Sequence, residues 1–215
     1  MDKLYYYNLS LEELEKIKNY KVKPKLLLHV CCGPCSAFPL MFLNPYFDIT
    51  IYYNNSNIFP SEEYYRRLEE MKKFVDQLNN ESGLNIKYII PNYDEEEYSK
   101  MLSIYKDARE GGERCFLCYR LRLEEAYEYA VNNDFDYVTT VMTVSSQKNS
   151  IKLNEIGLEL QKKYPSCKYF VSDFKKKQGA DVGRRISNAY GLYRQQYCGC
   201  RYSYYEYLKR IESLK

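Results

Sequence analysis

Apolar runs of strand length alternate along the chain with amphipathic stretches of helical length. The apolar runs are Lys25–Val30, Phe47–Tyr53, Ile86–Ile90, Asp136–Val141 and Lys168–Val171. The helical stretches are Ser61–Leu78, Arg114–Val131 and Asn149–Tyr164. Strands that alternate with helices of this length are typical of βαβ crossovers, which place the strands parallel in one sheet. The pattern predicts an α/β fold with a mostly parallel sheet of about five strands.

Helices are also predicted outside this alternating region. Ser10 and Glu13 have the spacing of a capping box, which predicts a short helix that begins there and ends near Asn19. The tail, residues 181–215, lacks strand signals and predicts two helices around Cys198. We therefore expect a single compact unit with three parts: an N-terminal helical extension (1–24), an α/β metal-binding catalytic domain (25–180) and a C-terminal helical segment that completes the site (181–215).

Composition narrows the class of protein. The chain has 215 residues, of which 45% are hydrophobic and 28% charged, and its net charge is only +3. No stretch approaches 18 apolar residues, and the first residues lack a signal-peptide pattern. We therefore expect a cytoplasmic protein with no membrane partner. The charge balance by itself does not indicate nucleic-acid binding.

Cysteine spacing is the most informative chemical feature. Seven of the eight cysteines fall into three groups: Cys31, Cys32 and Cys35; Cys115 and Cys118; Cys198 and Cys200. Structural disulfides are disfavoured in the cytosol, so clustered thiols there indicate metal binding or redox chemistry. Sites in parallel α/β sheets form outside the carboxyl ends of the strands, and the first group directly follows the first predicted strand. We expect all three groups to meet at that edge, and Cys167 to be an ordinary buried residue.

Three chemistries compete for these cysteines. Cys115, Cys118, Cys198 and Cys200 could form a complete tetrahedral zinc site, as in a zinc-stapled RNA-binding module. Cys32-Gly-Pro-Cys35 is the tetrapeptide of thioredoxin-like dithiol oxidoreductases. Iron–sulfur chemistry is the third, and we favour it because seven thiols exceed the needs of one zinc ion. A c-type haem is excluded, since Tyr119 and not His follows Cys118.

A few other residues are candidates for the same site. His29 is the only histidine, which argues against ordinary histidine-based metal catalysis. Asp173 ends the last predicted strand and is the carboxylate expected nearest the metals. The basic residues that follow could contact phosphates, with the region of Arg194 and Arg201 as the next candidate. These basic residues are Lys175, Lys176, Lys177, Arg184 and Arg185.

Four co-linear motifs together resemble the QueH family of epoxyqueuosine reductases. They are LLLHVCCGPCS (26–36), GGERCFLCYRLRL (111–123), SDFKKK (172–177) and GLYRQQYCGC (191–200). The resemblance runs from about Lys25 to Ser203 and includes Lys148-Asn149. It departs from the family at Ser145–Lys148, where a Ser-Pro turn is expected. The resemblance implies a Rossmann-like sheet of the nucleotide α-hydrolase type.

The resemblance also implies an activity and its cofactors. The activity is the two-electron removal of the epoxide oxygen from epoxyqueuosine at the wobble position of tRNA, with an external electron donor. The implied cofactor is a [4Fe–4S] cluster, with thiols left over for a second iron or other metal ion, and without cobalamin. Candidate catalytic residues are Cys31, Cys32, Cys35 and Asp173. Candidate cluster ligands are Cys31, Cys32, Cys115, Cys118, Cys198 and Cys200, and all seven clustered cysteines are candidate metal ligands. Which four hold the cluster stays open.

Overall fold

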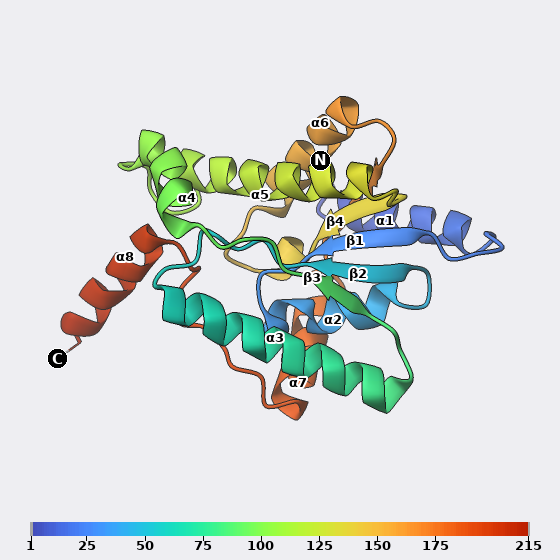
Figure 1. Cartoon of the computed structure of the whole chain (residues 1–215), viewed down its shortest axis with the longest axis horizontal. Coiled ribbons are helices and arrows are strands. Elements are labelled where there is room, and N and C mark those ends of the chain that lie inside the picture. Colours follow the sequence, from blue (N-terminus) through green and yellow to red (C-terminus); the bar gives the residue numbers. More distant parts are fainter. Residues whose placement is uncertain (1, 215) are drawn as a thin grey trace.

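The computed structural model describes residues 2–214, and its centre is a sheet of five parallel strands (Figure 1). The strands lie in the order β3-β2-β1-β4-β5. Their bounds are β1 Lys25–His29, β2 Asp48–Tyr52, β3 Lys87–Ile89, β4 Tyr137–Thr140 and β5 Lys168–Tyr169. This order is that of doubly wound, Rossmann-like sheets. The predicted α/β class and parallel sheet are confirmed, although β3 and β5 are shorter than the apolar runs suggested.

Helices cover both faces of the sheet. The α-helices are α1 Tyr5–Ile17, α2 Gly33–Leu43, α3 Ser61–Ser82, α4 Glu95–Leu102, α5 Glu113–Asn132, α6 Ser150–Lys163, α7 Gly179–Ala189 and α8 Arg201–Glu212. Two 3₁₀ turns, η1 Ser103–Tyr105 and η2 Val141–Val144, complete the set. In Figure 1, α5 and α6 lie on one face, α2, α3 and α7 on the other, and α8 projects from the body. Among residues 2–214, no helix is both long and apolar enough to cross a membrane.

The central strand shows why the sequence pattern predicted the sheet. Leu26, Leu27 and Leu28 of β1 are all fully buried, as expected for a parallel strand with helices on both faces. β1 pairs with β2 on one side and with β4 on the other. The chain therefore reverses its winding direction between β1 and β4, and ligands in such sheets bind at that switch point.

The predicted start of the first helix was wrong. The helix α1 begins at Tyr5, and Ser10 lies inside it, where its hydroxyl donates a hydrogen bond to the Tyr7 carbonyl (2.6 Å). A serine that bonds back to its own helix cannot cap that helix. Leu14 and Ile17 then anchor α1 in the core. The two helices predicted in the tail are confirmed as α7 and α8, and α4 was missed by the sequence pattern.

Candidate metal centre

The first cysteine group lies at the switch point, where β1 turns into α2. Cys32 caps the N-terminus of α2, and its Sγ accepts a hydrogen bond from the Cys35 N–H (3.3 Å). The Sγ atoms of Cys31, Cys32 and Cys35 all lie within 4.8 Å of one another. Cys31 and Cys32 are buried, with 7% and 1% of their surface exposed. Three thiols at this spacing can bind one metal ion without rearrangement of the backbone.

Close contact between these three thiols gives them different pKa values. Hydrogen bonds from Cys32 and Cys35 lower the pKa of Cys31 well below its usual range, against the effect of burial. Burial raises the pKa of Cys32 to about 12. Hydrogen bonds to Cys31 and Cys32, together with burial, raise the pKa of Cys35 well above its usual value. Of the three thiols, Cys31 therefore loses its proton most readily, and Cys32 and Cys35 keep theirs to higher pH.

The other four cysteines lie at the N-termini of two further helices. Cys115 and Cys118 occupy the first turns of α5, and the Cys115 Sγ accepts a hydrogen bond from the Gly111 N–H (3.2 Å). Cys200 caps α8 through the Ser203 N–H (3.5 Å). Free N–H groups and the helix dipole favour thiolates at helix N-termini, but burial outweighs this effect and raises the pKa of Cys115 and Cys200.

These two pairs lie near each other although they come from distant segments of the chain. Burial, together with the negative charges of Cys198 and Cys200, raises the pKa of Cys118 to about 12, against the effect of Arg122. Burial is also the main cause of the raised pKa of Cys115, and the charges of Cys198 and Cys200 add to it. Within residues 2–214, however, only the first group has three ligand atoms within 4.8 Å of one another. The ligand atoms of Cys115, Cys118, Cys198 and Cys200 are therefore more widely spaced than those of the first group, and we call these four cysteines the wider set.

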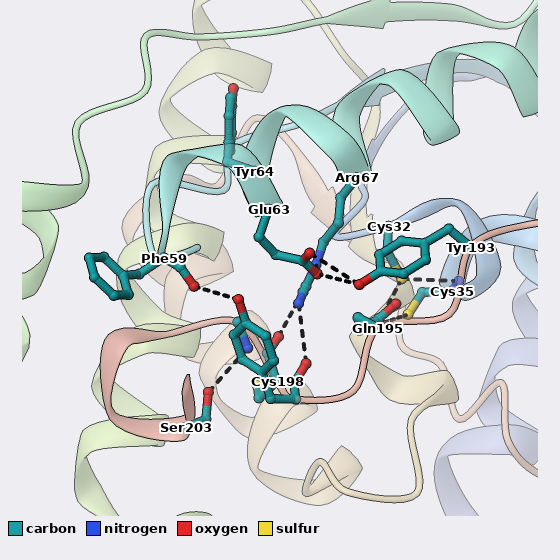
Figure 2. A network of polar contacts seen from close by, with 12 residues as sticks. Cys32, Cys35, Phe59, Glu63, Tyr64, Arg67, Tyr193, Gln195, Cys198 and Ser203 are labelled. Atoms are coloured by element: carbon teal, nitrogen blue, oxygen red, sulfur yellow. Dashed lines mark hydrogen bonds and ion pairs between the residues drawn. The ribbon is translucent and has the colours of Figure 1, made fainter. Parts of the chain in front are cut away.

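A buried polar network holds the segment of Cys198 against α3 (Figure 2). Arg67 donates to the carbonyls of Cys198 (2.9 Å) and Tyr197 (3.2 Å) and is ion-paired with Glu63 (2.7 Å). Gln195, from the same segment, donates to the Cys32 Sγ (3.3 Å). The segment that carries Cys198 thus reaches the first cysteine group through Gln195.

A cavity of about 510 Å³ opens beside these groups. Lys148, Gln195 and Cys198 line it on the side of the cysteines, and Tyr207 and Arg210 of α8 line it further out. A ligand in this cavity would reach a metal centre from the carboxyl edge of the sheet, which is where parallel α/β folds bind their substrates.

Comparison with known proteins identifies the family. The model of the family described as "Epoxyqueuosine reductase QueH" matches residues 26–206. This chain belongs to the QueH family. It is 37% identical over 198 residues to the epoxyqueuosine reductase QueH of Streptococcus pyogenes serotype M1, which covers 92% of the chain and 77% of that relative. It is 42% identical to the QueH of Staphylococcus aureus, over 83% of the chain and 75% of the relative. The QueH of Thermotoga maritima is 33% identical, over 84% and 91%.

A structural comparison adds one solved protein to these QueH relatives. The NMN synthetase from Francisella tularensis matches with a TM-score of 0.49 at 14% identity, over 98% of this chain and 86% of that protein. The resemblance to QueH seen in the four motifs is confirmed, because the matched region contains all of them.

The other predicted QueH site residues lie in different surroundings. Asp173 is buried and accepts a hydrogen bond from the Ser150 hydroxyl (3.1 Å), and burial raises its pKa. It is not among the ligand atoms gathered around Cys31. His29 is fully buried, with its Nδ1 bonded to the Thr140 hydroxyl (2.7 Å), and burial lowers its pKa well below the usual range. Cys167 is buried in the core, as the sequence predicted.

The predicted basic residues differ in how free they are to bind a partner. Lys175 donates to the carbonyls of Lys148 (3.0 Å) and Ser145 (3.4 Å), and burial lowers its pKa. Lys177 is exposed, and Lys176 is half-buried. Arg184 is exposed but paired with Asp181, and Arg185 is exposed. Lys175 therefore serves its own loop, whereas its two neighbours remain accessible.

Sequence reasoning missed four residues of the site. Arg67, Arg122, Lys148 and Gln195 approach the cysteines only through tertiary structure. One local signal was available for Arg122, because it follows Cys118 by four residues and so shares its face of α5. Lys148 was noted only as part of a family motif.

Proposed function

We propose that this protein is an epoxyqueuosine reductase that acts on tRNA. The observation that carries the proposal is its membership of the QueH family, and the seven clustered cysteines support it. The reaction adds two electrons and two protons to the epoxide, breaks both of its C–O bonds, and yields an alkene and water. A one-electron carrier protein, or dithionite in vitro, supplies the electrons.

The donor set supports an iron–sulfur cluster as the cofactor. Cys115, Cys118, Cys198 and Cys200 supply four thiolates, and the first group supplies three more that are already gathered. Thiolates around one ion lie closer together than thiolates around a four-iron cube, so we assign the wider set to a [4Fe–4S] cluster. The first group, Cys31, Cys32 and Cys35, then binds a second metal ion.

These groups have complementary roles in the proposed reaction. Bound at these cysteines, the cluster supplies electrons one at a time and the second metal ion acts as a Lewis acid for the epoxide oxygen. The cavity beside Cys198 receives the modified base after it is splayed out of the anticodon loop. Tyr207 then stacks on that base, and Gln195 orients it. Lys176 and Lys177 contact the tRNA phosphates nearby.

Anaerobic purification and a turnover assay test the proposal. We expect iron and sulfide in the purified protein, and loss of one oxygen from epoxyqueuosine in tRNA, detected by mass spectrometry after nuclease digestion. Cys118→Ser should abolish turnover, because it removes a cluster ligand. Cys167→Ser is the matched control, since Cys167 is a buried cysteine in the core outside the three groups, and it should keep both cofactor and turnover.

Two results would contradict the proposal. Stoichiometric zinc without sulfide would indicate a structural zinc site. Reduction of insulin by the metal-free chain, unaffected by Cys118→Ser, would indicate a dithiol oxidoreductase that uses only Cys32 and Cys35.

A further inference from the structure

Arg122 is a buried cation without an anionic partner. Only 3% of its surface is exposed, and its Nε has no hydrogen-bond partner among the described residues. Its one side-chain partner is the neutral Asn55 Oδ1. No carboxylate within residues 2–214 lies in ion-pair distance of it. Burying a guanidinium is costly unless a negative charge lies close by, so an anion is expected next to Arg122.

The other buried arginines make the contrast clear. Arg67 is ion-paired with Glu63. Arg114 has no carboxylate, but its Nη1 donates to three backbone carbonyls, those of Tyr105, Lys106 and Ala108. Arg67 thus has a carboxylate partner and Arg114 has a set of carbonyls, although the Nε of Arg114, like that of Arg122, has no hydrogen-bond partner among the described residues. Among the described residues, Arg122 has neither a carboxylate partner nor a set of carbonyls around it. Its anionic partner is therefore expected to be something other than a carboxylate or a carbonyl of the protein.

The position of Arg122 points to the cysteines as the site of that anion. It lies one helical turn after Cys118 on the same face of α5. Asn55, to which it donates, in turn donates to the carbonyl of Val30 (2.8 Å), the residue before Cys31. Arg122 therefore lies between the first group and the wider set. The charges of Cys118 and Cys31 outweigh burial and raise the pKa of Arg122.

Lys148 is a second cation near the cysteines, half-buried where Arg122 is buried. It follows η2 after β4, so it faces the cysteines from the other side of the switch point, and it lines the cavity together with Cys198. Among the residues described, no carboxylate is paired with it. Burial alone would lower its pKa, but the charges of Cys198, Cys31 and Cys35 raise it.

We infer that Arg122, with Lys148, sets the reduction potential of the iron–sulfur centre by placing fixed positive charge between the cysteine groups. The inference rests on the proposed function, because it presupposes that such a centre is bound. Reduction adds negative charge to the centre. A cation held nearby in a medium of low dielectric constant stabilises the reduced form and makes the centre easier to reduce. Arg122 and Lys148 are positioning residues in this role and need not touch the substrate.

The test is a redox titration of the reconstituted protein, followed by electron paramagnetic resonance in the absence of tRNA. For Arg122→Gln, we expect the ratio of reduced to oxidised centre at a fixed potential to fall about tenfold, a shift of about 59 mV for a one-electron couple. Arg122→Lys keeps the charge and should stay near the wild-type potential. Arg120→Gln is the control, because Arg120 lies on the same helix but is exposed and paired with Glu159.

A fully loaded Arg122→Gln protein with the wild-type potential would overturn the inference. If Arg122→Gln does not fold or load the centre, Lys148→Met provides the test, since Lys148 lines an open cavity. A lowered potential in Lys148→Met would then support the inference, and an unchanged potential would overturn it. Failure of the proposed function itself is a different result, namely a wild-type protein without sulfide or a reducible centre.

Discussion

The two sets of cysteines differ in how the fold brings them together. Cys31, Cys32 and Cys35 come from one turn between β1 and α2 and have ligand atoms within 4.8 Å of one another; Cys31 and Cys32 are buried and Cys35 is half-buried. The wider set, Cys115, Cys118, Cys198 and Cys200, joins the start of α5 to the segment before α8. Only the first set is formed by a single local element.

Because of this difference, different parts of the fold hold the two sets in place. The first set depends on the sheet, whose central strand is buried on both faces. The wider set depends on the side chains that hold the segment of Cys198, above all Arg67. A single substitution far from the cysteines in sequence should therefore disrupt one set and spare the other.

The largest effect is expected for Arg67→Met. The change removes hydrogen bonds to the carbonyls of Tyr197 and Cys198 and leaves Glu63 buried without its partner. Breaking a buried ion pair in this way costs about 3–5 kcal/mol. We expect the variant to lose its sulfide and most of its iron, while the first group still binds one Co²⁺ with a thiolate absorption band. Urea unfolding and metal analysis measure both effects.

Lys72→Met is the control for this comparison. Lys72 is ion-paired with Glu69 on the same helix, but the pair is exposed, so its loss should cost less than about 1 kcal/mol. Wild-type stability and iron content in Arg67→Met would contradict the proposed dependence of the wider set on this network.

Metal binding to the first group should weaken steeply as the pH falls. The pKa of Cys32 is raised to about 12 and that of Cys35 is raised well above its usual value, so both thiols must release a proton to bind a metal. Cys31, whose pKa is lowered, loses its proton most readily of the three and contributes least to this pH dependence. The affinity for Co²⁺ should rise roughly a hundredfold per pH unit, about tenfold for each released proton. Competition titrations between about pH 6 and 8 measure the slope; a slope near zero would refute this protonation pattern.

His29 should make the metal-free sheet less stable in acid. Burial lowers its pKa in the folded protein well below the value of about 6.5 in the unfolded chain. As the pH falls through about 6.5, the unfolded chain takes up a proton that the folded chain cannot. The free energy of unfolding should then decrease by up to about 1.4 kcal/mol per pH unit.

The variant His29→Asn isolates this contribution. His29 is the only histidine, so no other imidazole obscures the comparison. Urea unfolding of the metal-free protein at about pH 7 and pH 5 should show a smaller loss of stability in the variant than in the wild type. An equal loss in both would show that His29 does not limit the stability of the strand beneath the first group.

The smallest effects concern the basic loop. Lys176→Ala and Lys177→Ala should each make the slope of log affinity for tRNA against log salt shallower by about 0.7–0.9, because each removes one phosphate contact. Lys175→Ala is the comparison, since Lys175 is half-buried and donates to two backbone carbonyls. It should leave the slope unchanged. Equal slopes in all three variants and the wild type would place the tRNA elsewhere.

The sequence carried most of the fold because the responsible forces are local or periodic. The leucines of β1 and the helices between strands follow directly from the apolar pattern. Ser10 gave a wrong prediction, since its spacing to Glu13 suits a helix start but α1 begins at Tyr5. The short α4 has a capping residue, Asp94, and an acidic first turn, yet too few residues to give a clear period.

Of the candidate site, only the cysteines could be predicted from the sequence. Their spacing is local, so the chain reveals the three groups without a structure. Arg67, Arg122 and Lys148 could not be found in this way, because their partners lie on other elements. A buried cation is not distinguishable from a surface cation until the packing around it is known. For Asp173 the structure shows a hydrogen bond with Ser150, and its role beside the metals stays a prediction.

The place of Cys198 and Cys200 late in the chain has a consequence for biosynthesis. A growing polypeptide folds from its N-terminal side as it leaves the ribosome. The strands of the sheet and the turn with Cys31 are all translated before the segment that Arg67 holds. The nascent protein therefore exposes its first thiols to oxidants and stray metal ions before the closing segment exists. A metal centre bound by the wider set could be completed only after Cys198 and Cys200 have been translated.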